Sequence, residues 1–338
     1  MTENLVALRS WVNGLVRREA DPPDWVRLPG ANQAPLVPGE DYFQVRIRRV
    51  EVAYEQEWLE KYAAMLVVAT EFSYGGEEVT RPAVIGPSML EQADVSAPIS
   101  STIADTVVAG PHPLRAGGVG VALALHRVAR GNVVGHLFEV VDGAAKALDL
   151  AGGLTPYTTL ARVVVSGITA LTGGDRALVA RRDQFTSVQP GDFALLSPRT
   201  KLDPTTLSFV DGELHTTIAG KATPVRGADY VVYSVERVAP SDVDVTRLPL
   251  HRRWLEVLDE ANRASTPEIW RSTKVRLSAL VGAAYTSPDL TWHHAEDLER
   301  EWTAKALSRR DRARELGDMG GTVELQDARS HALAVLEL

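Results

Sequence analysis

Three glycines in four residues precede an apolar run at 115–121, RAGGVGV, and a run of this type could cradle a phosphate. A phosphate loop needs its glycines between a strand and a helix N-terminus, where backbone N–H groups and the helix dipole face the anion. From Val119 to His126, however, large and small side chains alternate with a period of two. The glycines therefore lead into a strand, and the sequence predicts no nucleotide-binding loop.

Two other clusters have the residue types of a metal site without enough ligands. His293 and Asp297 are one helical turn apart and could share a zinc ion, but a zinc site needs three or four ligands. Asp242 and Asp244 have the alternate spacing of a calcium loop, without its further oxygens and its glycine turn. We predict no metal site and no cofactor.

The sequence contains no known catalytic motif. It has no P-loop, no zinc-protease pattern, no nucleophile elbow and no EF-hand loop. The 8 histidines are spread thinly, and any of the 44 acidic residues could pair in space. The absence of cysteine excludes disulfides, thiolate metal sites and thiol nucleophiles. We therefore nominate no catalytic residue and favour a non-enzymatic role.

The amino-acid composition also limits the classes of partner that the protein is expected to bind. The net charge of −8 over 338 residues disfavours binding to nucleic acid and to anionic membrane surfaces. The start of the chain lacks the basic segment of a signal peptide, and no window approaches 18 apolar residues, so we expect no membrane span. A chain of this size without cysteine fits the reducing cytoplasm.

Residues 1–41 are predicted to form an amphipathic helix and a proline-rich linker. Within 3–19, apolar side chains recur at helical spacing, and residues 21–41 contain five prolines. The helix face could pack on the chain's own core or bind a protein partner. A membrane-surface helix is the least favoured alternative, because the polar face is not strongly basic. The partner-binding candidates on this face are Leu5, Leu8, Trp11, Val12 and Leu15.

Residues 42–240 have the pattern of a β-rich domain. A slip in the alternation predicts a β-bulge near Arg48 and Arg49. Hairpin turns are expected at 75–76 and 211–212, and Pro82 should place its strand near a sheet edge. Capping residues and helical periodicity predict an inserted helical pair over 132–173.

Residues 241–338 are predicted to be helical. One helix follows Pro240, a second begins at Thr266 with a proline and an acid after the cap, and a third ends at the glycines near 317–321. Separate runs of strands and helices favour an α+β fold over a doubly wound parallel sheet. We expect a mainly antiparallel β-sandwich-like unit with an inserted helical pair and a helical C-terminal region.

The middle of the chain also resembles a known group of proteins. The resemblance covers about 60–240. Its clearest parts are TVVAGPHPLRAGGVGVALALHRVARGNVVGHLFEVVDGAAKALD at 106–149 and PGDFALLSP at 190–198. The amino-acid sequence of this region is similar to that of uncharacterised actinobacterial proteins associated with caspase- and TPR-linked conflict (defence) systems. The resemblance implies an accessory, partner-binding role beside a protease or effector, and it carries no active-site residue to this chain.

These observations favour a non-catalytic, cytoplasmic interaction module, such as a scaffold, sensor or accessory subunit, with a protein partner and without nucleic acid. A homo-oligomer is compatible with the sequence. Two alternatives stay open. One is a hydrolase whose site is assembled from distant residues, which would show as a pocket where perturbed acids or histidines converge. The other is a β-sandwich that binds a small ligand.

Overall fold

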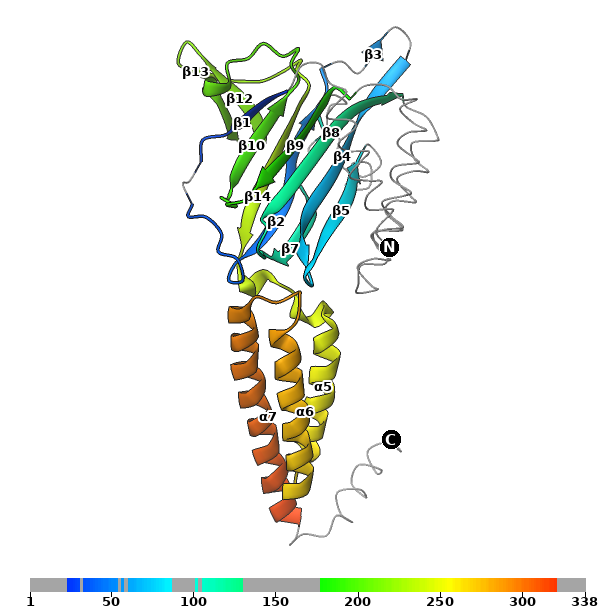
Figure 1. Cartoon of the computed structure of the whole chain (residues 1–338), viewed down its shortest axis with the longest axis vertical. Coiled ribbons are helices and arrows are strands. Elements are labelled where there is room, and N and C mark those ends of the chain that lie inside the picture. Colours follow the sequence, from blue (N-terminus) through cyan, green and yellow to red (C-terminus); the bar gives the residue numbers. More distant parts are fainter. Residues whose placement is uncertain are drawn as a thin grey trace, which may run out of the picture. The chain divides into compact units, whose positions relative to one another are not determined.

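The computed structural model describes residues 23–30, 33–53, 56–57, 60–86, 101–102, 105–129 and 177–320. The chain divides into two compact units, Met1–Ala239 and Pro240–Leu338. The described part of the first unit is built of strands and that of the second of helices (Figure 1). The fold is α+β with antiparallel sheets and C-terminal helices, as the sequence predicted.

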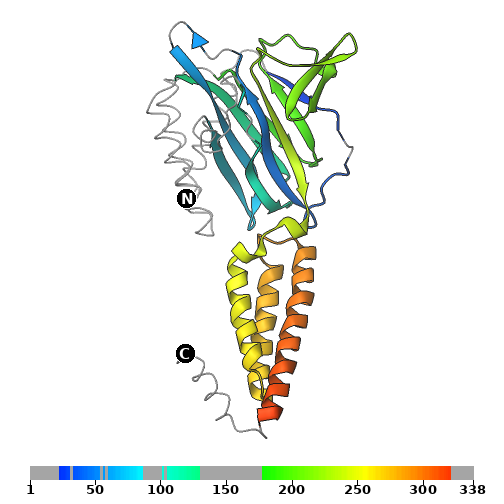
Figure 2. The same cartoon turned by 180° about the vertical axis from the view of Figure 1, so that it is seen from behind.

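Two sheets form the β-sandwich of the first unit, and a small third sheet accompanies them (Figure 2). The site sheet, named here for the pocket described below, has the order β1-β10-β14-β2-β6, with β7 also beside β2. Its strands are β1 (Asp24–Arg27), β2 (Tyr42–Glu51), β6 (Ser101–Thr102), β7 (Thr106–Pro113), β10 (Gly191–Leu196) and β14 (Tyr230–Val238).

The facing sheet has the order β3-β4-β8-β9, with β5 also beside β4, and the small sheet has the order β11-β12-β13. Strands of the facing sheet are β3 (Gln56–Glu57), β4 (Glu60–Tyr74), β5 (Glu77–Ile85), β8 (Val119–Ala129) and β9 (Val179–Phe185). The small sheet holds β11 (Leu207–Val210), β12 (Glu213–Ile218) and β13 (Lys221–Pro224). Every described strand pair is antiparallel.

The main core lies between the site sheet and the facing sheet. Because side chains alternate along a strand, every second residue of β2, β8 and β14 points into it. These inward residues include Phe43, Val45, Ile47, Val119, Val121, Leu123, Leu125, Val231, Tyr233 and Val235. A second cluster packs the small sheet against the other face of β10 and β14, through Ala194, Leu196, Leu207, Leu214, Tyr230 and Val232. The site sheet is thus covered on one face by the facing sheet and partly on the other by the small sheet.

The predicted bulge is confirmed. In the pairing of β14 with β2, Val232 stands opposite Arg49 and Tyr233 opposite Ile47, so Arg48 is the extra residue. Ile47 and Val50 point into the core, and the bulge therefore places both Arg48 and Arg49 on the opposite face of the sheet. This local irregularity is what brings two adjacent arginines to one side of a strand.

The predicted turns are also confirmed. Gly75 and Gly76 join β4 to β5, and Asp211 and Gly212 join β11 to β12, all four with positive φ. Such conformations match the twist of a two-residue hairpin. Pro82 lies on β5, which pairs with β4 alone among the described strands.

The glycine run at 117–120 belongs to a β-structure, as predicted. Gly117 and Gly118 have positive φ, and β8 follows them as an antiparallel strand between β4 and β9. A Cβ atom at Gly118 would lie 2.0 Å from the carbonyl oxygen of Phe185, so this glycine allows the close approach of β9. No helix N-terminus follows the run to receive a phosphate.

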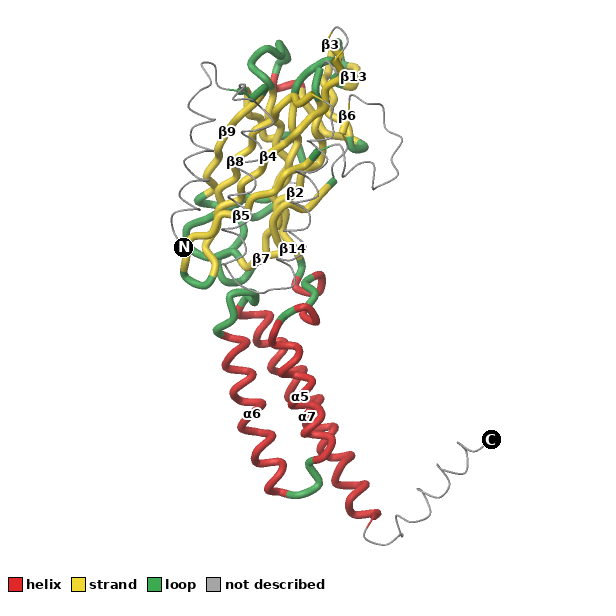
Figure 3. Tube along the Cα trace, turned by 90° about the vertical axis from the view of Figure 1, so that its right-hand side faces the viewer, coloured by secondary structure: helices red, strands yellow, loops and turns green. Residues whose placement is uncertain are grey.

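The described part of the second unit contains three helices, shown in red in Figure 3, and each of them packs against the other two. They are α5 (Pro249–Arg263), α6 (Pro267–Tyr285) and α7 (Trp292–Gly320), preceded by the 3-10 turns η2 (Pro240–Asp242) and η3 (Val245–Arg247). A further turn, η1 (Pro204–Thr206), belongs to the first unit. Thr266 caps α6 through its side chain, as predicted. Gly317 lies inside α7 rather than at its end.

The structure changes one part of the domain interpretation. Asp24–Arg27, expected within the proline-rich linker of 1–41, form β1 and pair with β10. Leu28 and Leu36 are buried, so this stretch packs on the sandwich instead of separating from it. Hydrophobic burial outweighs the proline content here. The predicted helices over 3–19 and 132–173 lie outside the described residues.

Candidate ligand-binding site

A pocket of about 690 Å³ lies at the site sheet, lined by residues of β2, β10 and β14 and of the chain around the end of β1. Its floor is formed by β10 and β14 and its wall by the chain that follows β1. The lining residues are Arg27, Leu28, Pro29, Gly30, Gln33, Arg48, Pro190, Gly191, Asp192, Ser234, Val235, Glu236 and Arg237. Three arginines and two acids make this a strongly polar cavity.

Strand alternation explains why three of the lining side chains, on β10 and β14, share one face. Phe193, Tyr233 and Val235 point into the main core, so their neighbours Asp192, Ser234 and Glu236 project from the other side. Asp192 lies directly opposite Ser234 in the pairing of β10 with β14. The bulge in β2 adds Arg48 to the same face.

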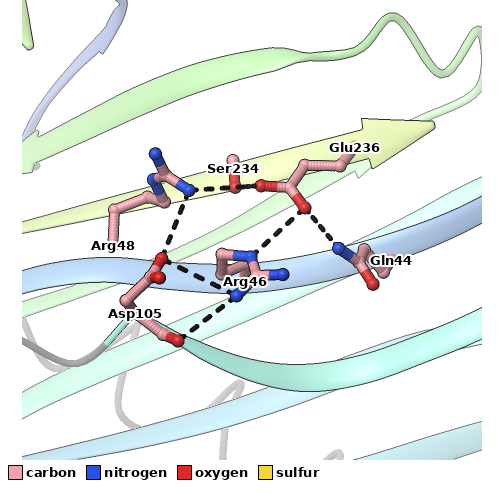
Figure 4. A network of polar contacts seen from close by, with 6 residues as sticks. All are labelled: Gln44, Arg46, Arg48, Asp105, Ser234 and Glu236. Carbon is pink, nitrogen blue, oxygen red and sulfur yellow. Dashed lines mark hydrogen bonds and ion pairs between the residues drawn. The ribbon is translucent and has the colours of Figure 1, made fainter. Parts of the chain in front are cut away.

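Glu236 is the centre of a polar network across β14 and β2 (Figure 4). One carboxylate oxygen accepts a hydrogen bond from Ser234 Oγ at 2.8 Å and lies 3.6 Å from Nη1 of Arg48. The other accepts from Gln44 Nε2 and, at 3.2 Å, from Arg46 Nε. Both oxygens of Glu236 are therefore occupied by protein donors.

Asp105, the residue directly before β7, joins the network. Its carboxylate lies 3.2 Å from Nη1 of Arg48 and 3.7 Å from Nη1 of Arg46. Its backbone oxygen also accepts from Arg46 at 3.3 Å. Arg46 and Arg48 thus share the same two acidic partners, but only Arg48 lines the pocket.

Two further arginines of the pocket wall are held by protein oxygens. Arg27 donates to the side chain of Gln189 and, at 2.9 Å, to the carbonyl of Pro190. Arg237 pairs with Asp41 at 2.8 Å and donates to the carbonyls at positions 34 and 35. These contacts tie the segment after β1 to the site sheet and fix the wall of the pocket.

Asp192 differs from the other acids of the site. Within the described residues, its carboxylate accepts no hydrogen bond and forms no ion pair of 4.0 Å or less. Burial raises the pKa of Asp192, the positive charge of Arg48 lowers it, and the negative charge of Glu236 raises it, with a net rise. Asp192 is the acceptor that the pocket keeps available.

The pKa of Glu236 moves the other way. Burial alone would raise it, but the hydrogen bonds from Gln44 and Ser234 and the charge of Arg46 outweigh burial and hold the pKa below its ordinary value. An ionised carboxylate with this many donors is a weak base. Its contacts suit a structural role.

A buried ionic cluster next to the site attaches the small sheet. Arg49, 1% exposed, donates at 2.9 Å to the carbonyl of Gly212 and lies 3.4 Å from Glu51 and 3.5 Å from Glu213. Tyr230 donates to Glu51 at 2.7 Å. Burial raises the pKa of Glu51 despite these partners. The cluster fixes the turn between β11 and β12 to the site sheet.

The structure does not bring the sequence candidates for metal binding together. No group of three or more His, Asp or Glu side chains in the described part of the chain is placed to hold a metal ion. His293 stacks on Trp292, and Asp297 pairs with Arg300. Asp244 caps η3 by accepting from the backbone N–H of Thr246 at 3.1 Å. The partner-binding candidates Leu5, Leu8, Trp11, Val12 and Leu15 lie outside the described residues.

Sequence reasoning did not find the pocket. The polar face of β2 is visible as the alternate residues Gln44, Arg46 and Arg48, and that of β14 as Ser234 and Glu236. Nothing in the sequence shows that these strands, nearly 190 residues apart, are neighbours with Asp192 beside them. The bulge at Arg48 is the one local signal that pointed to this place.

Comparisons with protein-family models and with curated proteins give no match for this chain. None of the helices in the described ranges is both long and apolar enough to cross a membrane.

Proposed function

We propose that this protein is a non-catalytic interaction module of the sensor type, in which the β-sandwich binds a small polar ligand on the site sheet. The observation that carries the proposal is the state of the charged groups in the pocket. Glu236, Arg27 and Arg237 are held by protein partners, and Asp192 alone among its acids accepts from none of the described residues. Fixed walls around an available acceptor suit recognition.

The state of Ser234 and Glu236 supports binding more than catalysis. A nucleophile needs a nearby base of suitable pKa. Ser234 is 2% exposed and donates to Glu236, whose pKa is lowered, so this pair is poorly suited to activate a hydroxyl. The same bond holds Glu236 in place at the edge of the pocket.

A thermal-shift screen of the full chain with polar metabolites tests the proposal. Ligands that bind the folded state raise the melting temperature. We expect at least one compound to do so in the wild type and to lose its effect in Asp192→Asn. Asp24→Asn is the matched control, because Asp24 is an exposed acid on β1 outside the pocket. A screen without any shift, or shifts unchanged by Asp192→Asn, contradicts the proposal.

A hydrolase is the second candidate, because Asp192 and Glu236 face one pocket with pKa values moved in opposite directions. Such a separation can assign acid and base roles. Assays with chromogenic ester, glycoside and phosphate substrates test it. Turnover that disappears in both Asp192→Asn and Glu236→Gln supports the hydrolase and rejects the non-catalytic proposal.

The protein partner of the module is proposed to contact the N-terminal face of Leu5, Leu8, Trp11, Val12 and Leu15. This part of the proposal, like the cytoplasmic location and the placement beside a protease or effector, is supported by the sequence pattern, the lack of cysteine and the resemblance described above. A pull-down from the native host with the full chain and with residues 1–20 removed tests it. A specific partner lost on truncation supports the contact, and equal capture by both forms contradicts it.

A further inference from the structure

Two opposite charges face the pocket without meeting. Asp192 on β10 and Arg48 on β2 both line it, on either side of β14. The two side chains influence each other electrostatically, yet they form no ion pair of 4.0 Å or less. Opposite charges that line the same cavity would gain by pairing directly. Here they remain apart on the wall of a cavity large enough for a small molecule.

Arg48 is available to a ligand as well. All of its hydrogen bonds and ion pairs within the described residues use Nη1, to Asp105 and to Glu236. Its guanidinium carbon lies 5.8 Å from the ring centre of Phe209, which supports the group from one side. A guanidinium has five N–H donors in a planar fork, and its other edge suits a carboxylate.

The charges around this pair nearly cancel. The pocket and the ion pairs that its residues form contain four arginines and four acids. These are Arg27, Arg46, Arg48 and Arg237, and Asp41, Asp105, Asp192 and Glu236. A site without a large excess of either sign gives little advantage to a ligand with a single charge. It favours a molecule that is itself neutral overall and carries one charge of each sign.

We propose that the pocket binds a small zwitterion of the free α-amino acid class, with the ligand ammonium group on Asp192 and its carboxylate on Arg48. The inference rests on the proposed ligand-binding function and names the ligand class for that same site. The backbone of β14 spans the distance between the two charged groups, and the volume of about 690 Å³ leaves room for a side chain or a second residue. A ligand in this position would bridge the gap that the two side chains leave.

Isothermal titration of the full chain with free L-amino acids and with the dipeptide Gly-Gly tests the inference. The best binder is then compared with its N-acetyl form, which lacks the ammonium group, and with its methyl ester, which lacks the carboxylate. We expect each capped form to bind about tenfold more weakly or worse, since a charge-assisted contact is lost. Capped and free forms with equal affinity would overturn the inference, and this comparison uses wild-type protein alone.

Paired variants assign the two charges to residues. Asp192→Asn should weaken binding of the free amino acid and leave the affinity for the N-acetyl form unchanged. Arg48→Gln should weaken binding of the free amino acid and leave the affinity for the methyl ester unchanged. Arg46→Gln is the matched control for Arg48, because Arg46 shares both acidic partners but does not line the pocket. An equal loss in Arg46→Gln would mean that the network acts only through stability, and it would overturn the role of Arg48.

The outcomes separate this inference from the function on which it rests. If no amino acid binds but another polar metabolite does, and does so through Asp192, ligand binding stands and the zwitterion is wrong. If inorganic phosphate binds through Arg48 independently of Asp192, the zwitterion is again wrong. If neither amino acids nor the wider metabolite panel binds, both proposals fail.

Discussion

A carboxylate oxygen of Glu236 on β14 lies 3.2 Å from Nε of Arg46 on the neighbouring strand β2. The same carboxylate accepts hydrogen bonds from Ser234 and Gln44, so three side chains on two neighbouring strands depend on it. The arrangement fixes the edge of the pocket before any ligand arrives. Rigid walls of this kind reduce the entropic cost of binding.

Replacing Glu236 should therefore reduce stability in a pH-dependent way. The pKa of Glu236 is lowered in the folded state, so its contribution is present above the ordinary value of 4.5 and is lost as the pH falls through the folded pKa. Glu236→Gln should lower the free energy of unfolding by about 1–2 kcal/mol at pH 7. Denaturant unfolding at several pH values checks this, and a difference that grows below pH 4.5 would contradict it.

His112 should make the first unit sensitive to mild acid. Burial, helped by the charge of Arg81, lowers the pKa of His112 to about 3 from 6.5. The unfolded chain therefore binds more protons below pH 6.5, and stability should fall with pH in that range, by up to about 1.4 kcal/mol for each pH unit. The ring stacks on Phe72 with centroids 4.5 Å apart.

The variant His112→Phe keeps an aromatic ring and removes this titration. We expect its melting temperature to fall less than that of the wild type between pH 6.5 and pH 4. His293→Gln, an exposed histidine of the other unit, is the control. Parallel pH profiles for wild type and His112→Phe would refute the role of His112.

The buried Arg49 should be essential for attaching the small sheet. Removing one partner of a buried ion pair leaves an uncompensated charge and costs about 3–5 kcal/mol. Arg49→Met should therefore destabilise the first unit strongly, because Glu51 loses its buried cation. Tyr230→Phe removes one hydrogen bond to the same carboxylate and should cost about 1–3 kcal/mol. Chemical unfolding followed by intrinsic fluorescence measures both, and a milder effect for Arg49→Met than for Tyr230→Phe would be inconsistent with this cluster.

In the helical unit, Trp254 of α5 stacks on Trp302 of α7 with ring centroids 5.5 Å apart. Trp302 is 2% exposed, so Trp302→Ala should destabilise this unit by about 3–5 kcal/mol through the cavity it leaves. Leu307→Ala, on the same helix but 40% exposed, should change stability by less than about 1 kcal/mol. Calorimetry should show the loss in Trp302→Ala alone, and similar losses in both variants would reject the assigned core.

Local signals in the sequence predicted much of the fold. The hairpin at Asp211 and Gly212, the cap at Thr266 and the bulge at Arg48 each depend on a few adjacent residues, so they could be read directly. The strand at Asp24–Arg27 could not, because prolines around it indicated a linker and only burial against β10 makes it a strand. Tertiary contacts overrode local propensity there.

The pocket could not be predicted from the sequence for the same reason. Asp192 and Glu236 are ordinary acids in the sequence, and their shared pocket exists only because β10, β14 and β2 are neighbours in the sheet. For the metal candidates, in contrast, the sequence suggested a cluster that the structure does not form. His293 and Asp297 have suggestive spacing, but each contacts a residue of its own helix instead.

The most direct test of the central claim is an amide chemical-shift titration of the full chain with a pool of free amino acids. If the site sheet binds the ligand, the perturbed backbone amides should gather at Gly191, Asp192, Ser234 and Glu236 and be absent from Asp192→Asn. A spectrum that does not change, or changes confined to the helical unit beyond Pro240, would contradict ligand binding at this pocket.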